Sequence, residues 1–226
     1  MLSKGAARVW ERGIAREVAI SHFVAAKTRR PATVIHNGVP APDDYARRTS
    51  PRRILVMQRL ETEKDTGTAL RAFARSGLAD DGWRLLVAGR GAEAGRLQDE
   101  AIRLGIAGAT DWLGFVDNPE ATRRHADVLL APAPAEPFGL SVVEAMATGL
   151  AVVAADGGAH RETLGEVGLL FPPGDAEAAA AALRRLADSP AWMRDLGQAG
   201  RHRHKQFFSL ERHLAALERL YHEVSP

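Results

Sequence analysis

ADVLLAPAPAEPFGLSVVEAMATG, residues 126–149, carries the clearest structural pattern of this chain. It begins with a short apolar run, continues through a proline-containing loop, and ends in a segment whose apolar residues recur at helical spacing. A buried strand followed by a helix is the unit from which parallel sheets are built. The stretch therefore predicts a strand–loop–helix unit, with Glu136 on the loop and Glu144 in the first turn of the helix.

The same alternation of short apolar runs and longer amphipathic stretches extends along the rest of the chain. The expected strands are residues 18–21, 33–36, 53–57, 84–88, 127–131, 151–155 and 168–171. The expected helices are residues 64–76, 92–104, 118–125, 140–148, 159–164, 175–188 and 190–207. This pattern predicts an α/β fold with a doubly wound, Rossmann-like parallel sheet.

Composition excludes several classes of protein. The chain has 226 residues, of which 46% are hydrophobic and 26% charged, and it contains no cysteine. This is enough for one large domain, and it excludes a disordered chain, a disulfide scaffold and cysteine-ligated zinc. The basic residues are not interleaved with aromatic ones, so we expect no nucleic-acid partner. No apolar run approaches about 20 residues and the start has no apolar signal core, so we expect a cytoplasmic protein with peripheral membrane contact left open.

Residues 38–51 contain many turn-forming residues and lack apolar periodicity, which indicates a linker and a domain boundary near residue 50. Residues 1–37 are expected to form a helix, a strand, a second helix and a second strand, too little to bury a core alone. At the other end, apolar positions between Leu210 and Tyr221 predict a terminal helix over residues 210–224.

The two acids of the quoted stretch have both chemical and structural interpretations. If the helix begins near Gly139, the free N–H groups of Gly139, Leu140 and Ser141 converge at its positive end and form an anion site. A phosphate fits such a site. Alternatively, Ser141-x-x-Glu144 has the spacing of a capping box, and Glu136 is a solvated loop acid.

The stretch resembles the E-x7-E element of the retaining nucleotide-sugar glycosyltransferases of family four, which have the two-lobed GT-B fold. The resemblance covers most of the sequence, from VAISHFVA and VIHNGVP, through ILVMQRLETEK, LLVAGRG and WLGFV, to LAVVAADGGAHRETL and GLLFPPGD. It implies the carboxy-terminal lobe with a remnant of the amino-terminal lobe. Residues 1–50 would then end the acceptor-side lobe and form the linker, residues 51–207 would bind the donor, and residues 208–226 would form the crossover helix.

The resemblance implies three residues with catalytic roles. Arg59 and Lys64 match the family's basic pair that contacts the donor diphosphate. A forked guanidinium and an ammonium at this place would stabilise charge as the glycosidic bond breaks. Glu136 would face the donor sugar near its reacting carbon, although attack from the side of departure needs no protein nucleophile.

The resemblance also implies a donor-binding set. Glu144 would bind the ribose hydroxyls, and the amides of residues 138–141 would contact phosphate or sugar. The turn at Gly89 would lie beside the donor, and Phe115 or Val116 near the base, with a buried strand end as the alternative there. The expected donor-binding residues are Glu144, Phe138, Gly139, Leu140, Ser141, Gly89, Phe115 and Val116.

The implied reaction is transfer of a hexose-type sugar from a nucleoside-diphosphate sugar to a saccharide, lipid or small-molecule acceptor. We expect no cofactor and no metal: the sequence has no D-x-D string, and His202 and His204 point apart on a helix. Without the missing amino-terminal lobe, the chain should bind its donor but transfer the sugar poorly. The alternatives are a nucleotide-sugar epimerase or phosphorylase of the same fold, and a non-catalytic nucleotide-binding or NAD-binding module.

Overall fold

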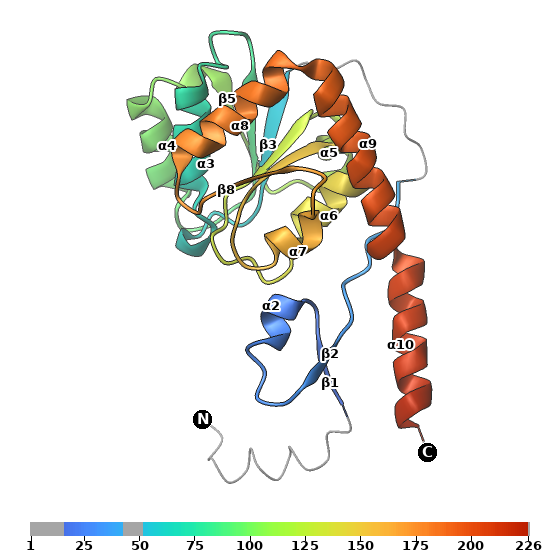
Figure 1. The fold of residues 1–226 in the computed structure, drawn as a ribbon. Helices are drawn as coiled ribbons and strands as arrows, with labels where there is room; N and C mark the ends of the chain where they lie inside the picture. The colour runs from blue at the N-terminus through green and yellow to red at the C-terminus, as the bar shows by residue number, and fades with distance from the viewer. Residues whose placement is uncertain (1–15, 43–51, 226) are drawn as a thin grey trace, which may run out of the picture.

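The computed structural model describes residues 16–42 and 52–225, which contain two parallel sheets (Figure 1). A small sheet pairs β1 (Glu17–Ala19) with β2 (Ala32–Val34), and α2 (His22–Ala25) connects them. The large sheet has six strands in the order β5-β4-β3-β6-β7-β8. Its strands are β3 (Arg53–Met57), β4 (Arg84–Ala88), β5 (Thr110–Gly114), β6 (Val128–Ala131), β7 (Ala151–Ala155) and β8 (Leu169–Phe171).

The strand order reverses once, between β3 and β6. From β3 the chain proceeds outward to β4 and β5, then returns to place β6 against the free side of β3, and continues to β7 and β8. Each of these neighbouring pairs is parallel. This is the doubly wound topology that the sequence predicts, and folds of this kind bind ligands where the order reverses, which is here at the carboxyl ends of β3 and β6.

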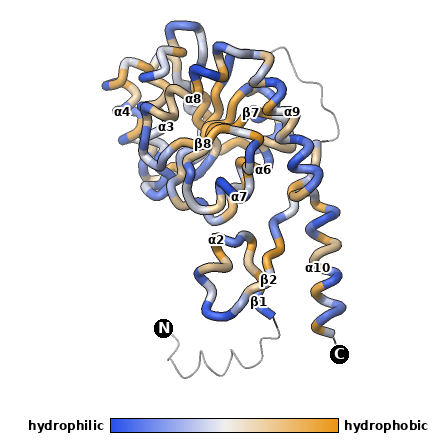
Figure 2. The backbone as a smooth tube through the Cα atoms, in the orientation of Figure 1, coloured by the Kyte–Doolittle hydropathy of each residue, from blue (hydrophilic) through white to orange (hydrophobic). Residues whose placement is uncertain are grey.

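Both faces of the large sheet are buried, which explains why its central strands are continuous apolar runs. Side chains alternate between two cores: Ile54 and Val56 belong to one cluster, and Leu55 between them belongs to the other. Figure 2 shows hydrophobic residues concentrated in these strands. The covering helices are α3 (Thr66–Ser76), α4 (Ala94–Arg103), α5 (Pro119–Arg124), α6 (Leu140–Ala147), α7 (His160–Leu164), α8 (Ala176–Asp188) and α9 (Pro190–Phe207).

One strand and the start of one helix differ from the expected elements, besides shifts of a few residues at other element ends. β5 was not among the expected strands, because TDWLG lies at the sheet edge with only Thr110 buried and so lacks an apolar run. The helix expected from Lys64 begins later: Thr62–Lys64 form a short 3₁₀ helix, η1, and α3 begins at Thr66. Asp65 separates the two with a left-handed backbone, φ 47°, and its carboxylate accepts a hydrogen bond from the Thr68 N–H.

Residues 16–42 are attached to the large domain by backbone and side-chain contacts. Ser21 Oγ donates to the Pro137 carbonyl at 2.7 Å, and the Val39 N–H donates to the Phe208 carbonyl at 2.9 Å. The terminal helix α10 (Leu210–Val224) extends alongside this segment, where the His213 ring Nδ1 lies 2.7 Å from the His36 carbonyl (Figure 1). The helix expected before residue 16 and the boundary expected near residue 50 lie outside the described residues.

Within the described residues, no helix combines the length and the apolar character that crossing a bilayer requires. α9, with 18 residues, and α10, with 15, carry charged side chains throughout their length.

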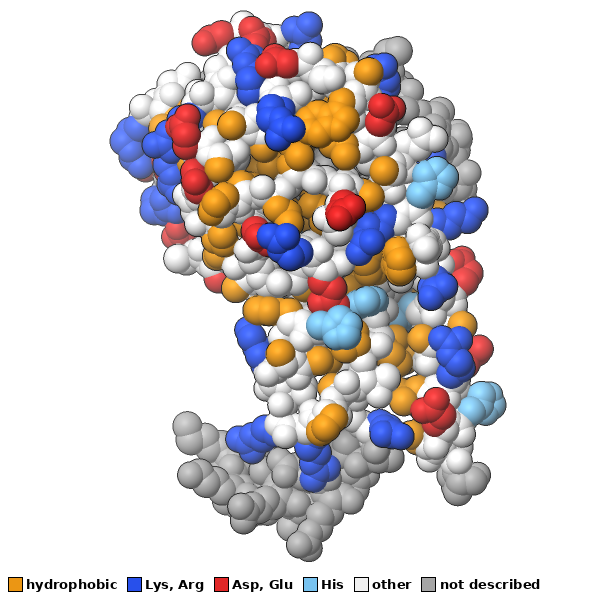
Figure 3. Space-filling view, in the orientation of Figure 1, with side chains coloured by type: hydrophobic (Ala, Val, Ile, Leu, Met, Phe, Trp, Pro, Cys, Tyr) orange, Lys and Arg blue, Asp and Glu red, His pale blue; other side chains and the backbone are white. Residues whose placement is uncertain are grey.

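Glu162 on α7 connects the domain to residues 16–42. Its Oε1 lies 2.6 Å from the Nε2 of His36, and the His22 N–H donates to both carboxylate oxygens, at 3.0 and 2.9 Å. Figure 3 shows histidine side chains at this junction. Burial acts to raise the pKa of Glu162, but the hydrogen bonds from His22 and His36 outweigh it, so the net effect is a pKa below its ordinary value.

We expect Glu162→Gln to lower the free energy of unfolding by about 1–2 kcal/mol near neutral pH, because hydrogen bonds to an ionised group are lost. A lowered pKa stabilises the folded state above the ordinary glutamate value of 4.5 and stops doing so as the pH falls through the folded-state pKa. The difference from wild type should therefore shrink toward low pH. Urea denaturation at several pH values measures it, with exposed Glu166→Gln as the control; a pH-independent difference would contradict the assignment.

Candidate functional site

The predicted site residues come from loops that leave the carboxyl ends of neighbouring strands. Arg59 and Lys64 follow β3, and Glu136 and the start of α6 follow β6. Because these two strands are adjacent at the point of order reversal, residues more than 70 positions apart in sequence meet there.

Lys64 and Glu136 form the central contact of the site. The Lys64 Nζ donates to Glu136 Oε2 at 2.6 Å, and their side chains are only 17% and 18% exposed. A half-enclosed ion pair of this kind is less screened by salt than one on the open surface. The structure thus brings together two of the three residues that the sequence analysis assigned to catalysis.

Local structure fixes the position of Lys64. The Gln58 side-chain amide donates to the Lys64 carbonyl at 2.8 Å and to Thr66 Oγ1 at 2.9 Å. The left-handed Asp65 then turns the chain into α3. A non-glycine residue in this conformation is uncommon, and here its side-chain hydrogen bonds to Thr68 compensate for it.

The loop that follows β7 packs against the backbone of Glu136. The Ala159 N–H donates to the Glu136 carbonyl at 2.8 Å. Gly158, with φ +61°, packs so closely that a Cβ there would lie 2.2 Å from the Glu136 oxygen and 2.4 Å from its nitrogen. The Gly157-Gly158 turn is therefore needed for the close approach of two backbones.

His160 lies directly beneath this loop and was not predicted. It is buried, and its Nδ1 lies 2.9 Å from the Ala155 carbonyl. Because a carbonyl only accepts, Nδ1 carries the proton. Burial lowers the pKa of His160, so the ring is neutral at pH 7 and its Nε2 is an acceptor facing Gly139. No motif spacing relates His160 to Gly139, so only the fold reveals that the two are neighbours.

The amino end of α6 has free donors. The helix begins at Leu140 after Gly139, whose φ of +88° suits glycine, and no side chain caps it. Among the described residues, the N–H groups of Leu140 and Ser141 donate to no backbone carbonyl. The capping box considered for Ser141 and Glu144 does not form, and Glu144 lies one turn inside the helix. These amides, at the positive end of the helix dipole, are suited to an anion.

Glu144 is held by a residue that the sequence analysis did not select. The Arg123 Nη1 donates to Glu144 Oε2 at 2.8 Å. Arg123 is the fifth residue of α5, so the pair joins that helix to α6. The sequence offered no signal, because Arg123 and Arg124 are adjacent arginines and only the fold separates a buried one from its neighbour.

The other predicted residues make contacts of their own. Arg59 is 67% exposed and pairs with Glu63 at 2.7 Å, so the structure does not bring it to Lys64 and Glu136. The Phe138 side chain is buried in the core, which leaves only its backbone for a ligand. The Gly89 N–H donates to the Gly114 carbonyl at 2.7 Å, joining the turns after β4 and β5.

Phe115 and Val116 behave differently from one another. Phe115 is exposed, with the Arg90 guanidinium 5.8 Å from its ring centre. Val116 packs partly against the core that contains Phe138. Phe115 is therefore the one of the two whose side chain is open to a ligand, and Leu140 and Ser141 remain candidates through their amides.

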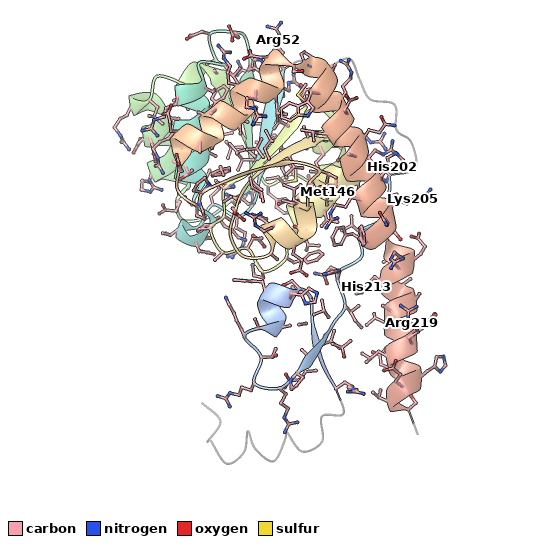
Figure 4. All side chains as sticks on the ribbon, in the orientation of Figure 1. Arg52, Met146, His202, Lys205, His213 and Arg219 are labelled. Carbon is pink, nitrogen blue, oxygen red and sulfur yellow. The ribbon has the colours of Figure 1, made fainter. Side chains whose placement is uncertain are left out.

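The two histidines of α9 are separate, as their spacing predicts. His204 is buried with its Nε2 2.8 Å from the Val39 carbonyl, whereas His202 lies on the exposed side of the helix (Figure 4). Across the described parts of the chain, no three His, Asp or Glu side chains are grouped closely enough to hold a metal ion.

A doubly wound sheet with paired charges at its order reversal defines a Rossmann-like α/β domain whose ligand lies at the carboxyl ends of its strands. Comparison with known proteins gives the family. The protein-family model described as "Glycosyl transferases group 1" matches residues 41–203, and the chain belongs to this family.

Relatives support the same assignment. The chain is 34% identical to a glycogen synthase of Mycobacterium tuberculosis over 197 residues, covering 84% of the chain and 48% of that relative. It is 30% identical to a lipopolysaccharide core biosynthesis mannosyltransferase of Rhizobium leguminosarum over 212 residues, covering 86% and 60%. The chain thus spans about half the length of the first relative.

Solved structures agree with the fold. Sucrose-phosphate synthase from Thermosynechococcus elongatus superposes with a TM-score of 0.82 at 28% identity, covering 99% of this chain and 64% of that one. TarM of S. aureus gives 0.83 at 16% identity, covering 97% and 47%. The prediction of a GT-B glycosyltransferase fold, represented here by its carboxy-terminal half, is confirmed.

The close packing of Gly158 against the Glu136 backbone can be tested by substitution. Gly158→Ala should lower stability by more than the roughly 1–2 kcal/mol expected for placing alanine in a left-handed conformation, because its Cβ also meets the Glu136 backbone. Gly174→Ala is the matched control, since φ is +79° there and nothing lies within 4 Å of the added Cβ. Thermal unfolding of both variants measures the difference, and equal losses would show that the contact is not tight.

Proposed function

We propose that this chain is the donor-binding part of a retaining, metal-independent glycosyltransferase of family four. It would take a hexose-type sugar from a nucleoside-diphosphate sugar and deliver it to a saccharide, lipid or small-molecule acceptor. The observation that carries the proposal is the Lys64–Glu136 ion pair beside the uncapped amino end of α6, in a chain of the glycosyl transferase group 1 family.

The geometry supports a different role for each of these residues. The free amides of Leu140 and Ser141, with the Lys64 ammonium, would bind the diphosphate and stabilise the charge that develops on it as the glycosidic bond breaks. Glu136, held beside Lys64, would accept hydrogen bonds from sugar hydroxyls. The acceptor oxygen would attack from the side that the diphosphate leaves, so no protein nucleophile is required. Arg59 would have to leave Glu63 to reach the diphosphate, which its exposure permits.

Several observations support sugar transfer over the alternatives. The relatives that share 30% identity or more include a glycogen synthase and several mannosyltransferases, whose names refer to hexose transfer rather than to epimerisation. A nicotinamide-binding module is disfavoured by the G-x-G-x-x-x-G spacing after β4, which is one residue too long for a dinucleotide fingerprint. We place the reaction in the cytoplasm, and full transfer would require an amino-terminal lobe to hold the acceptor.

Calorimetric titration of the wild-type chain with UDP, GDP and ADP tests the proposal. We expect one of them to bind, and Lys64→Met to weaken that binding at least tenfold, since a hydrogen bond between charged groups contributes about 1.5–3 kcal/mol. Lys205→Met on α9 is the control and should bind as wild type does. If none of the three nucleotides binds at millimolar concentration, the proposed function is wrong.

A further inference from the structure

Two adjacent arginines of α5 occupy different environments. Arg124 is about one-third exposed and pairs with Glu120 on its own helix at 2.6 Å. The side chain of Arg123 is only 9% exposed and crosses to α6, where its Nη1 donates to Glu144 Oε2 at 2.8 Å. The same Nη1 lies 3.5 Å from the sulfur of Met57, the last residue of β3. The Arg123 guanidinium therefore lies at the carboxyl end of β3, where the strand order reverses.

The ion pair between Arg123 and Glu144 is poorly suited to stabilising the fold. Removing a guanidinium from water is unfavourable, and the Nε of Arg123 is buried with no hydrogen-bond partner among the described residues. Burial lowers the pKa of Arg123, and the carboxylates of Glu144 and Glu120 oppose that effect. Ion pairs with one buried member are often no more stabilising than apolar side chains of the same volume. Conformational stability alone does not account for Arg123.

The pair is well suited to orienting a carboxylate. Glu144 is about one-third exposed, so part of its side chain faces solvent while Oε2 is held by the Arg123 guanidinium. A planar guanidinium anchored by its buried stem loses less freedom per hydrogen bond than a lysine would. Oε2 is occupied by Arg123, which leaves Oε1 and the remaining lone pairs to accept hydrogen bonds from a ligand.

We propose that Arg123 is a positioning residue for the nucleotide: it orients Glu144 toward the ribose hydroxyls and thereby sets the preference for a ribonucleotide over its deoxy forms. The inference rests on the proposed function and extends it to a residue that acts through Glu144. Removing Arg123 leaves a carboxylate that solvent can reach, so recognition should change more than folding does. Removing Glu144 instead would leave a buried guanidinium without its acceptor, which makes Arg123 the cleaner position to change.

The experiment measures the ratio of dissociation constants for a nucleoside diphosphate and its 2′-deoxy and 3′-deoxy forms, by calorimetry on the whole chain. UDP, GDP and ADP, each with its deoxy forms, are the probes. We expect wild type to bind the ribonucleotide about tenfold more tightly than at least one deoxy form, as befits a hydrogen bond to a charged acceptor. Arg123→Met should reduce that ratio to about threefold or less, with a melting temperature within a few degrees of wild type.

Matched variants separate positioning from a structural role. Arg124→Met, the adjacent arginine on the same helix, should keep the wild-type ratio, and Arg123→Lys should restore part of it. A purely structural role for Arg123 predicts the opposite: a lowered melting temperature with the ratio unchanged. If Arg123→Met does not fold, Arg123→Leu is used, and a folded Arg123 variant without a positive charge that keeps the wild-type ratio overturns the proposal.

The remaining outcomes distinguish this inference from the proposed function. Wild-type binding with no preference between the ribose and both deoxy forms overturns the role of Arg123 and leaves the proposed function standing. Binding of none of the nucleoside diphosphates overturns both. If Arg123→Met loses the preference for the ribonucleotide and Arg124→Met keeps it, the role of Arg123 and the proposed function are both supported.

Discussion

The ion pair between Lys64 and Glu136 joins the two halves of the large sheet where they meet. Its members leave the carboxyl ends of β3 and β6, the strands between which the order reverses, and they meet at 2.6 Å with little exposure to solvent. Everything else in the site is arranged around this contact. η1 and Asp65 position the lysine, the Gly157-Gly158 turn supports the glutamate, and α6 begins four residues after the glutamate.

This arrangement explains why seven residues separate Glu136 from Glu144. Part of the interval forms the loop that passes over His160, and the rest is the first turn of α6. The first acid therefore precedes the uncapped amides, and the second lies one turn beyond them on the same helix. A shorter interval would draw Glu144 into the capping position, where its carboxylate would satisfy the very N–H groups that an anion needs.

The sequence predicted most of the fold because its central strands are buried on both faces and its helices are amphipathic, patterns that are local in the chain. It missed β5 because an edge strand such as TDWLG buries little. In the site, the stretch 126–149 predicted Glu136 and the helix amides, and the family resemblance implied Lys64. Arg123 and His160 were not predicted. Arg123 pairs with Glu144 and the His160 ring lies near Gly139, each 21 residues away, and which of several similar side chains takes such a place depends on which one the fold buries.

Charge balance explains why two carboxylates can line a site for an anionic ligand. Glu136 and Glu144 alone would repel a diphosphate, yet each is already paired with a cation, Lys64 at 2.6 Å and Arg123 at 2.8 Å. Opposite charges at such distances largely cancel each other's field a few ångströms away. The amino end of α6, whose free amides favour an anion, adds an attraction that neither carboxylate offsets through a hydrogen bond of its own. The acids are thus available as hydrogen-bond acceptors for hydroxyl groups while the helix end attracts the phosphates.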